Sequence, residues 1–273
     1  MVKPKIDYGE FSTGLKYVSV GEGEQVVLLF LGGPGNDLPT GLGLNFYVKP
    51  FSPIIDQFKL YFITRKSGLP EGYTTHQMAG DYADIIQADF GGKVHGVIGL
   101  SYGGMIMQHF CALYPTMAEK FIILSATHKI SDAGRRLDQN YAELLSNGKN
   151  GAAMALIAEA IFPKGLKRLV FKPLLRLMGM FGGKHSSPTF AQDVLIEVHA
   201  EMIHDARENL GKIQVPVIIV CGDQDYYFPI EYFDEMTDLI PKVKLKVFHG
   251  KGHDIFEDPR AVAFILEQLQ APL

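Results

Sequence analysis

The stretch VHGVIGLSYGG, residues 94–104, decides the fold, because it joins an apolar run to a helical pattern through one sharp turn. Val94 to Leu100 predicts a buried strand, and Met105 to Tyr114 predicts a helix. Between them lies a G-x-S-x-G pattern, whose two glycines lack a Cβ and allow close backbone approach. This turn exposes the Ser101 hydroxyl at the end of the strand, which makes Ser101 a candidate nucleophile.

Outward from this turn, short apolar runs alternate with helical patterns. A Thr74-x-x-Gln77 capping pattern opens one helix before the Ser101 strand, and another helix is expected from about Asp258 to Gln268. Such alternation predicts an α/β fold with a mostly parallel central sheet flanked by helices. The expected strands are Val26–Leu31, Leu60–Thr64, Val94–Leu100, Phe121–Leu124, Val215–Cys221 and Val243–Phe248.

The strand and helix rhythm stops between residues 127 and 212, where helical, Met-rich patterns take over. We therefore expect a core made of residues 1–126 and 213–273, with residues 127–212 inserted as a helical cap. The length of 273 residues suits one large domain carrying an insertion, and 47% hydrophobic residues suffice for a substantial core.

Composition narrows the classes of function. A formal net charge of −4 gives no reason to expect nucleic-acid binding, which usually needs a basic surface. The polar start and the absence of a long apolar run predict a cytoplasmic protein. Cys111 and Cys221 lie far apart without a C-x-x-C pattern, so free thiols are expected, and the nine histidines show no zinc-type spacing. Neither a metal nor a cofactor is predicted.

Three further segments, together with Tyr102, offer the other groups that acyl transfer by a serine requires: a base, an acid that orients it, and donors for the oxyanion. The first apolar strand runs into Gly32-Gly33-Pro34-Gly35, where the backbone N–H of Gly33 is the expected oxyanion donor, paired with that of Tyr102. A later strand ends before Asp223 and Asp225, and His253 follows the last strand. The chain order Ser, Asp, His is the one expected for this arrangement.

Taken together, these segments resemble the α/β-hydrolase superfamily over nearly the whole chain except the cap. The resemblance rests on the G-x-S-x-G turn, on the segment VPVIIVCGDQD that ends at Asp225, and on Gly252-His253 before the final helix. It implies Asp225 as the acid, with Asp223 the competitor and Asp132 a remote third choice. Leu31 stands where the family often has a histidine, which removes a group that orients the oxyanion loop.

The expected activity is hydrolysis of a carboxylic ester or related small acyl substrate through an acyl-enzyme intermediate. Ser101 would attack, His253 would act as base, and Asp225 would orient the imidazole. Alternatives left open are a proline iminopeptidase-like peptidase, a carbon–carbon bond hydrolase, an acyltransferase, a cofactor-free relative that uses oxygen, and a ligand receptor that retains the three residues. No substrate-amine site is evident in the sequence. Oligomeric state and natural substrate are left undetermined.

The cap contains a basic window from Ala160 to Gln192 without Asp or Glu. Its apolar stripe is expected to pack as a lid over the core with the charges facing water, while contact with an anionic membrane surface is the weaker alternative. Met and Phe side chains predict an adaptable apolar pocket. The basic residues are Lys164, Lys167, Arg168, Lys172, Arg176 and Lys184; the stripe is Leu166, Leu169, Val170, Leu174, Leu177, Met178 and Phe181; the pocket candidates are Met154, Phe162, Met178, Met180 and Phe181.

Overall fold

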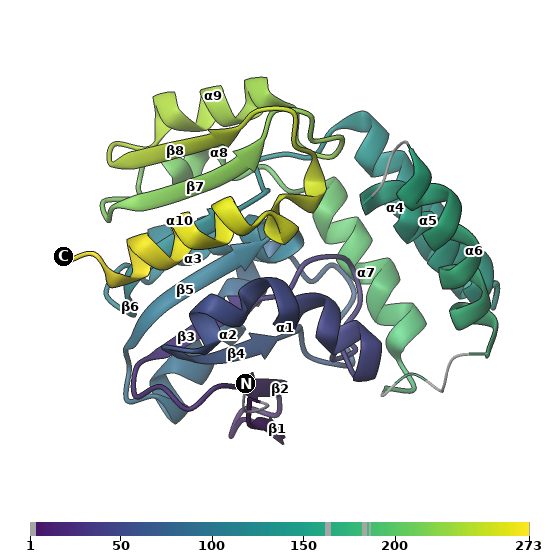
Figure 1. The fold of residues 1–273 in the computed structure, drawn as a ribbon, viewed down its shortest axis with the longest axis horizontal. Coiled ribbons are helices and arrows are strands. Elements are labelled where there is room, and N and C mark those ends of the chain that lie inside the picture. Colours follow the sequence, from purple (N-terminus) through teal and green to yellow (C-terminus); the bar gives the residue numbers. More distant parts are fainter. Residues whose placement is uncertain (1–3, 162–164, 182–184, 186, 273) are drawn as a thin grey trace.

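A single eight-stranded sheet forms the centre of the molecule in the computed structural model, which describes residues 4–161, 165–181, 185 and 187–272 (Figure 1). The strand order is β1-β2-β4-β3-β5-β6-β7-β8, in which β3 to β8 run parallel and β1 and β2 pair antiparallel at one edge. The predicted α/β fold is confirmed. The strands are β1 (Ile6–Glu10), β2 (Lys16–Val20), β3 (Val26–Phe30), β4 (Lys59–Ile63), β5 (Val94–Leu100), β6 (Ala118–Leu124), β7 (Val217–Gly222) and β8 (Val243–Phe248).

Helices cover both faces of the sheet, and each face has its own apolar core. On one face α1 (Gly41–Ile55) packs against α10 (Pro259–Gln270). The other face carries α2 (Thr75–Asp89), α3 (Tyr102–Leu113) and α9 (Ile230–Leu239). The apolar strands are thus buried on both sides, which is why they read as continuous apolar runs rather than alternating patterns.

Strand β5 lies in the middle of the sheet between β3 and β6, and Val97 is in register with Leu28 and Phe121. The predicted capping box at the start of α2 is present: the Thr74 side chain accepts from the N–H of Gln77, and the Gln77 side chain accepts from the N–H of Thr74. Because parallel strands end at the same edge, the loops after β3, β5, β7 and β8 meet there.

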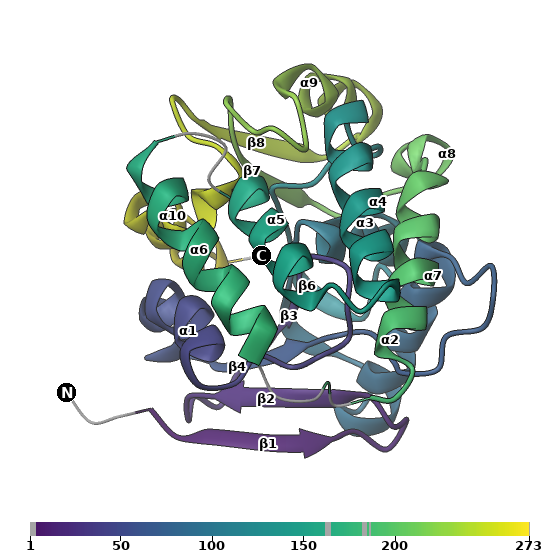
Figure 2. The same cartoon turned by 90° about the vertical axis from the view of Figure 1, so that its right-hand side faces the viewer.

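Between β6 and β7 the described residues form helices and no strand. These are α4 (Asp132–Ser146), α5 (Asn150–Ile161), α6 (Leu166–Phe181), α7 (Phe190–Met202) and the short α8 (Arg207–Leu210). Figure 2 shows α4 to α7 side by side over one side of the molecule. The short α8 instead packs against α3 and α9. The division into core and cap stays a prediction. Among the described helices, none is both long and apolar enough to cross a membrane.

Helix α6 contradicts the expected orientation of the cap stripe. The seven stripe residues are exposed, from 39% at Met178 to 76% at Leu166, whereas Arg168 and Lys172 both pair with Glu159 of α5. The expected packing of the stripe onto the core was therefore wrong for most of this helix: Arg168 and Lys172 face α5 and the stripe is exposed, although Met178 also lines the cavity described below. Pro173 lies inside one continuous helix. Of the residues named above, Phe162, Lys164 and Lys184 lie outside the described residues.

Close packing against α5 explains this orientation. Gly179 of α6 lies so near α5 that a Cβ there would be 2.6 Å from the carbonyl oxygen of Asn150, and Gly151 of α5 meets the Met180 side chain in the same way. Glycine contacts and the Glu159 ion pairs together hold one face of α6 on α5. The stripe on the remaining face has no described helix outside it in Figure 1, where α6 is outermost.

Three elements were missed by the sequence analysis. Strands β1 and β2 form a hairpin at the edge of the sheet. Charged and small polar residues interrupt both strands, so neither gives a long apolar run. Helix α1 contains Pro50 and Pro53, which read as helix breakers. Both prolines fall in its last two turns, and Phe51, Ile54 and Ile55 still bury the same face against the core.

Candidate active site

Ser101 lies on the turn between β5 and α3 in a strained backbone conformation, with φ 51° and ψ −117°. Its N–H donates to the carbonyl of Leu124 on β6 (2.9 Å), and its own carbonyl accepts from Gly104 and Met105. The two motif glycines are required by packing: a Cβ on Gly99 would lie 2.7 Å from the Gly103 carbonyl oxygen, and one on Gly103 would overlap Phe30. The strain holds the hydroxyl out from the sheet edge.

His253 meets this hydroxyl from the loop after β8. It begins a short 3₁₀ turn (His253–Glu257), and its Nε2 lies 3.0 Å from Ser101 Oγ. The imidazole is 11% exposed and lies beside the ring of Tyr227, with the two centroids 4.9 Å apart. In the neutral imidazole, Nδ1–H donates to a carboxylate and Nε2 accepts the serine proton.

Asp225 provides that carboxylate, while Asp223 points elsewhere. Nδ1 of His253 lies 2.9 Å and 3.2 Å from the two Asp225 oxygens, and Oδ1 also accepts from the backbone N–H of Tyr227. Asp223 instead contacts His249 Nδ1 (2.8 Å) and accepts from the N–H of Gly250 (2.7 Å). The remote candidate, Asp132, lies in the first turn of α4. Of the three acids, the structure brings Asp225 to His253.

Two opposing effects act on the His253 pKa. Burial lowers it, because a charged imidazolium is poorly solvated there, but the charge of Asp225 and the hydrogen bond to it raise it by more. Asp138 and Asp254 add smaller raising contributions. The pKa of His253 therefore lies above its ordinary value, which stabilises the imidazolium that forms when the serine gives up its proton.

The predicted oxyanion donors lie on either side of Ser101. The loop after β3 passes directly over the serine: a Cβ on Gly32 would lie 3.0 Å from the Cβ of Ser101. Gly33 follows with φ 69°, a conformation that favours glycine. Tyr102 is the first residue of α3, where helical geometry leaves the N–H without a partner inside the helix.

Sequence reasoning missed the group that fastens this loop. Arg65, which follows β4, donates to the carbonyl of Leu31 (2.8 Å), to that of Gly33 and to that of Gly35 (2.5 Å). Its guanidinium also lies over the Tyr102 ring at 4.9 Å. Leu31 occupies the position where a histidine often orients this loop in the family. Arg65 supplies hydrogen-bond donors to the same loop from another segment.

Glu197 of α7 completes this arrangement from the other side. Its Oε2 accepts from the Gly35 N–H (2.5 Å) and pairs with Arg65 (3.0 Å), and the two side chains are 0% and 1% exposed. The Tyr102 hydroxyl donates to the Glu197 carbonyl (2.8 Å). A helix between β6 and β7 thus holds the loop beside Ser101 in place.

A pattern in α7 could have revealed these contacts. Asp193, Glu197 and Glu201 are spaced by four residues, so they share one helix face, and all three are buried. Asp193 accepts from the N–H groups of Gly68 (3.1 Å) and Leu69 (2.8 Å). Three carboxylates on one face of an otherwise apolar helix indicate buried polar contacts rather than a solvated surface.

A cavity of about 590 Å³ opens beside Ser101 and His253. Most of its wall is apolar or aromatic, and Met154 and Met178 are part of it, whereas Met180 and Phe181 of the predicted pocket set are exposed. Two acids on its wall, Asp138 and Glu201, were not singled out by the sequence. No group of three or more metal-ligating side chains occurs in the part of the chain that the structure describes.

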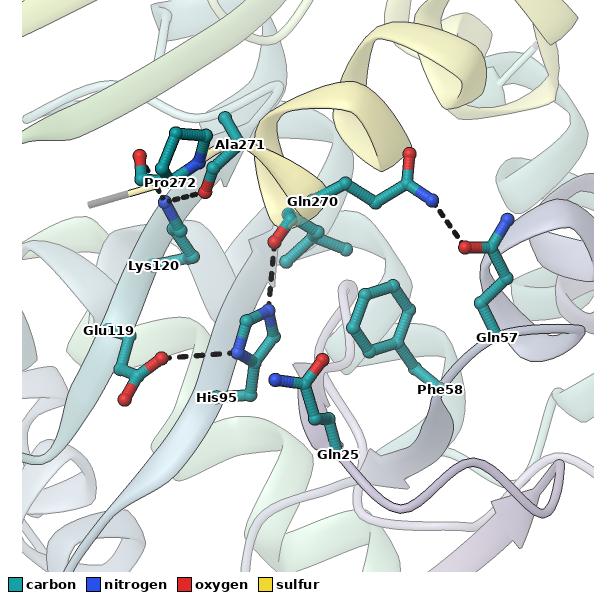
Figure 3. Close-up of a pocket in the computed structure, with 10 residues that line it drawn as sticks. Gln25, Gln57, Phe58, His95, Glu119, Lys120, Gln270, Ala271 and Pro272 are labelled. Atoms are coloured by element: carbon teal, nitrogen blue, oxygen red, sulfur yellow. Dashed lines mark hydrogen bonds and ion pairs between the residues drawn. The ribbon is translucent and has the colours of Figure 1, made fainter.

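A second hollow, of about 380 Å³, lies at the opposite edge of the sheet. Figure 3 shows His95 of β5 there, beside the carboxylate of Glu119. Its other ring nitrogen, Nε2, lies 2.8 Å from the carbonyl oxygen of Leu269. These residues lie at the amino ends of the parallel strands, away from the loops that carry Ser101 and His253. This hollow is therefore separate from the candidate active site.

The sequence matches the α/β hydrolase family over residues 37–263, and the chain belongs to that family. The match includes Ser101, Asp225 and His253 and ends before the last turns of α10. Membership indicates an enzyme, a hydrolase, that acts on a small molecule.

Proteins similar to this chain are named for several different activities. A Methanothermobacter thermautotrophicus protein named as a probable acyltransferase is 28% identical over 79% of this chain and 72% of its own length. A Yersinia enterocolitica protein provisionally named carbamate hydrolase RutD is 24% identical over 79% of both chains. An esterase from Exiguobacterium antarcticum superposes with a TM-score of 0.72 at 20% identity, covering 97% of this chain and 99% of its own, which shows the shared fold.

Proposed function

We propose that this protein hydrolyses a carboxylic ester, or a related small acyl compound, through an acyl-enzyme intermediate on Ser101. The observation that carries the proposal is the hydrogen-bonded chain from Ser101 through His253 to Asp225 at the wall of the larger cavity. A nucleophile, a base and an acid that orients the base are the groups that acyl transfer by serine requires.

The first half-reaction forms the acyl-enzyme. Ser101 Oγ attacks the substrate carbonyl carbon while its proton passes to His253 Nε2, and Asp225 stabilises the imidazolium. The backbone N–H groups of Gly33 and Tyr102 donate to the oxyanion of the tetrahedral intermediate. When the intermediate collapses, the bond to the leaving oxygen breaks, and that oxygen takes the proton from His253.

Water completes the cycle by the same route in reverse. His253 accepts a proton from a water molecule, whose oxygen attacks the acyl carbon and forms a second oxyanion in the same place. Collapse then breaks the bond to Ser101 Oγ, which recovers its proton from His253. The carboxylic acid leaves, and the enzyme returns to its starting state.

Labelling and turnover together test the proposal. A fluorophosphonate should label the wild type and Ser52→Ala, a change at an exposed serine, but not Ser101→Ala. With a series of p-nitrophenyl esters, Ser101→Ala should lose about four to six decades of kcat while staying folded. Near-normal turnover by Ser101→Ala would refute the mechanism. A single burst followed by negligible turnover would favour the receptor alternative.

Acyl transfer to an acceptor other than water is the second candidate. It is favoured by the name of the Methanothermobacter thermautotrophicus relative, which is similar over 79% of this chain. The acyl-enzyme would be the same, and an alcohol would replace water in the second half-reaction. Product analysis in the presence of a small alcohol distinguishes the two: a transferase forms mainly the new ester, whereas a hydrolase forms mainly the free acid.

A further inference from the structure

Two acids that the proposed mechanism does not use share the wall of the active-site cavity. Asp138 comes from α4 and Glu201 from α7, and both line the same cavity as Ser101 and His253. The residues are only 5% and 3% exposed. Two helices from distant parts of the chain therefore bring carboxyl groups to one place beside the candidate nucleophile.

These acids lack the partners that buried carboxylates usually have. Asp138 accepts from the Tyr227 hydroxyl (2.9 Å), and the two acids are close enough for each to shift the pKa of the other. Oε2 of Glu201 has no hydrogen-bond partner among the described residues, and neither acid has a Lys, Arg or His within ion-pair distance there. Burying an acid without a cation costs free energy, and a hydrogen-bond donor on a bound ligand would reduce that cost.

The charge of Arg135 lowers the pKa of Glu201, but the hydrogen bonds of Arg135 lead elsewhere. The guanidinium donates to the carbonyls of Ile130 (3.3 Å) and Met202 (2.8 Å). Arg65, the other buried guanidinium of this region, is paired with Glu197. Both cations are therefore engaged, which leaves the cavity-side acids available to a ligand.

The rest of the cavity wall has the same electrostatic character. Its described residues include no Lys or Arg, and the carboxylate of Asp37, which also lies there, pairs with His185. The rings of Tyr141 and Tyr227 also belong to this wall, and aromatic faces attract cations. Such a wall repels a carboxylate-bearing substrate and attracts one that carries a positive charge.

Burial acts on the pair in a way that suits a cationic ligand. It raises the pKa of Asp138 to about 6 and raises that of Glu201 further, since the charge of Asp138 adds to the burial. The charge of Asp138 thus opposes ionisation of Glu201, so a positive charge between them would favour the ionised form of both. An ammonium group would supply this positive charge in an apolar surrounding, where the attraction to a carboxylate is strong.

We propose that Asp138 and Glu201 bind a protonated amine of the substrate, so that the compounds cleaved at Ser101 are amine-bearing acyl compounds. The inference rests on the hydrolase function proposed above. The bound amine would lie near the reacting carbonyl, because Asp138 is hydrogen-bonded to Tyr227 and the centroid of the Tyr227 ring lies 4.9 Å from that of His253. The sequence hid this site, since its two acids lie far apart along the chain.

Matched ester pairs test the inference. The substrates are ethyl esters of ω-amino acids from glycine to 6-aminohexanoate. Each is compared with the ethyl alkanoate that has CH₃ in place of NH₃⁺, and hydrolysis is measured by the release of protons. In the wild type, kcat/KM for the amine should exceed that for its partner by about 10- to 100-fold at the best length. Asp138→Asn or Glu201→Gln should reduce this ratio at least tenfold. Glu143→Gln, a change on the exposed face of α4, should keep it.

Preference for the neutral ester at every length would overturn the inference, and so would a ratio unaffected by Asp138→Asn and Glu201→Gln. In either case continued cleavage of neutral esters leaves the proposed function standing. If neither ester is cleaved and Ser101 is not labelled, the hydrolase function fails instead.

Binding can be tested without turnover. At a concentration ten times its dissociation constant, n-butylammonium chloride should raise the wild-type Tm by roughly 3 to 5 °C. Sodium butyrate and sodium chloride at equal ionic strength should not, and the variant with both Asp138→Asn and Glu201→Gln should lose the response. Equal shifts with butylammonium and sodium chloride would contradict the ammonium site whether or not esters are cleaved.

Discussion

Removing Glu197 tests how α7 holds the loop beside Ser101. Arg65 and Glu197 are 1% and 0% exposed, so Glu197→Ala leaves a guanidinium buried without its counter-charge and takes an acceptor from the Gly35 N–H. Breaking such a pair costs about 3–5 kcal/mol of unfolding free energy. A typical domain has only about 5–15 kcal/mol, so the loss should be large in urea denaturation.

A second variant separates stability from positioning. Arg65→Met combined with Glu197→Ala removes both charges, so the double variant should recover most of the stability that Glu197→Ala loses. The carbonyls of Leu31, Gly33 and Gly35 still lose their shared donor. Because a loosened oxyanion loop misplaces a donor, kcat should stay about 10²- to 10³-fold below the wild type while KM changes little.

The assays are urea denaturation followed by circular dichroism, and ester turnover at a temperature where every variant is folded. Lys66→Ala is the control, since this neighbouring cation pairs with Asp81 away from the loop. The reasoning is refuted in one of two ways. A double variant as unstable as Glu197→Ala would show that the unpaired charge is not the cost, and full kcat in the double variant would show that Arg65 does not position the loop.

Other expected outcomes concern the acid, pH and packing. Asp225→Asn should lower kcat about 10⁴-fold, whereas Asp223→Asn should change it less than tenfold; equal losses would contradict the assignment. Since the base must be neutral, kcat/KM should fall as pH drops through the His253 pKa, with a midpoint above 6.5; a midpoint below 6.5 would contradict the Asp225 contribution. Leu28→Ala should lower the free energy of unfolding by about 2–5 kcal/mol in urea denaturation, because Leu28 is buried. Leu169→Ser, at an exposed site, should change it by no more than about 0.5 kcal/mol; a large loss at Leu169 would place that side chain in a packed interface.

Much of the core was predictable because its signals are local. Apolar runs buried on both faces indicate parallel strands, and the Thr74-x-x-Gln77 pattern indicates a helix start, without reference to distant residues. Elements with mixed signals were missed: the hairpin of β2 and the largely exposed edge strand β1, and α1 with its two prolines. Local rules fail there because an edge strand buries little and packing outweighs the prolines.

Helix α6 shows a second limit of pattern reasoning. Its sequence correctly indicates an amphipathic helix, but an amphipathic pattern does not say which face meets the protein. Glycine contacts and ion pairs to Glu159 turn Arg168 and Lys172 toward α5 and leave most of the apolar stripe exposed. The neighbour, not the helix, decides which face is buried.

By itself the sequence determined the candidate nucleophile Ser101, the candidate base His253 and the strands that place them, because each signal lies within about ten consecutive residues. Only the tertiary structure placed Asp225 rather than Asp223 against His253, since the two acids share one turn and differ in direction. It alone joined Arg65 to Glu197 and Asp138 to Glu201. Contacts between such distant residues depend on the path of the whole chain, and a linear pattern does not carry that path.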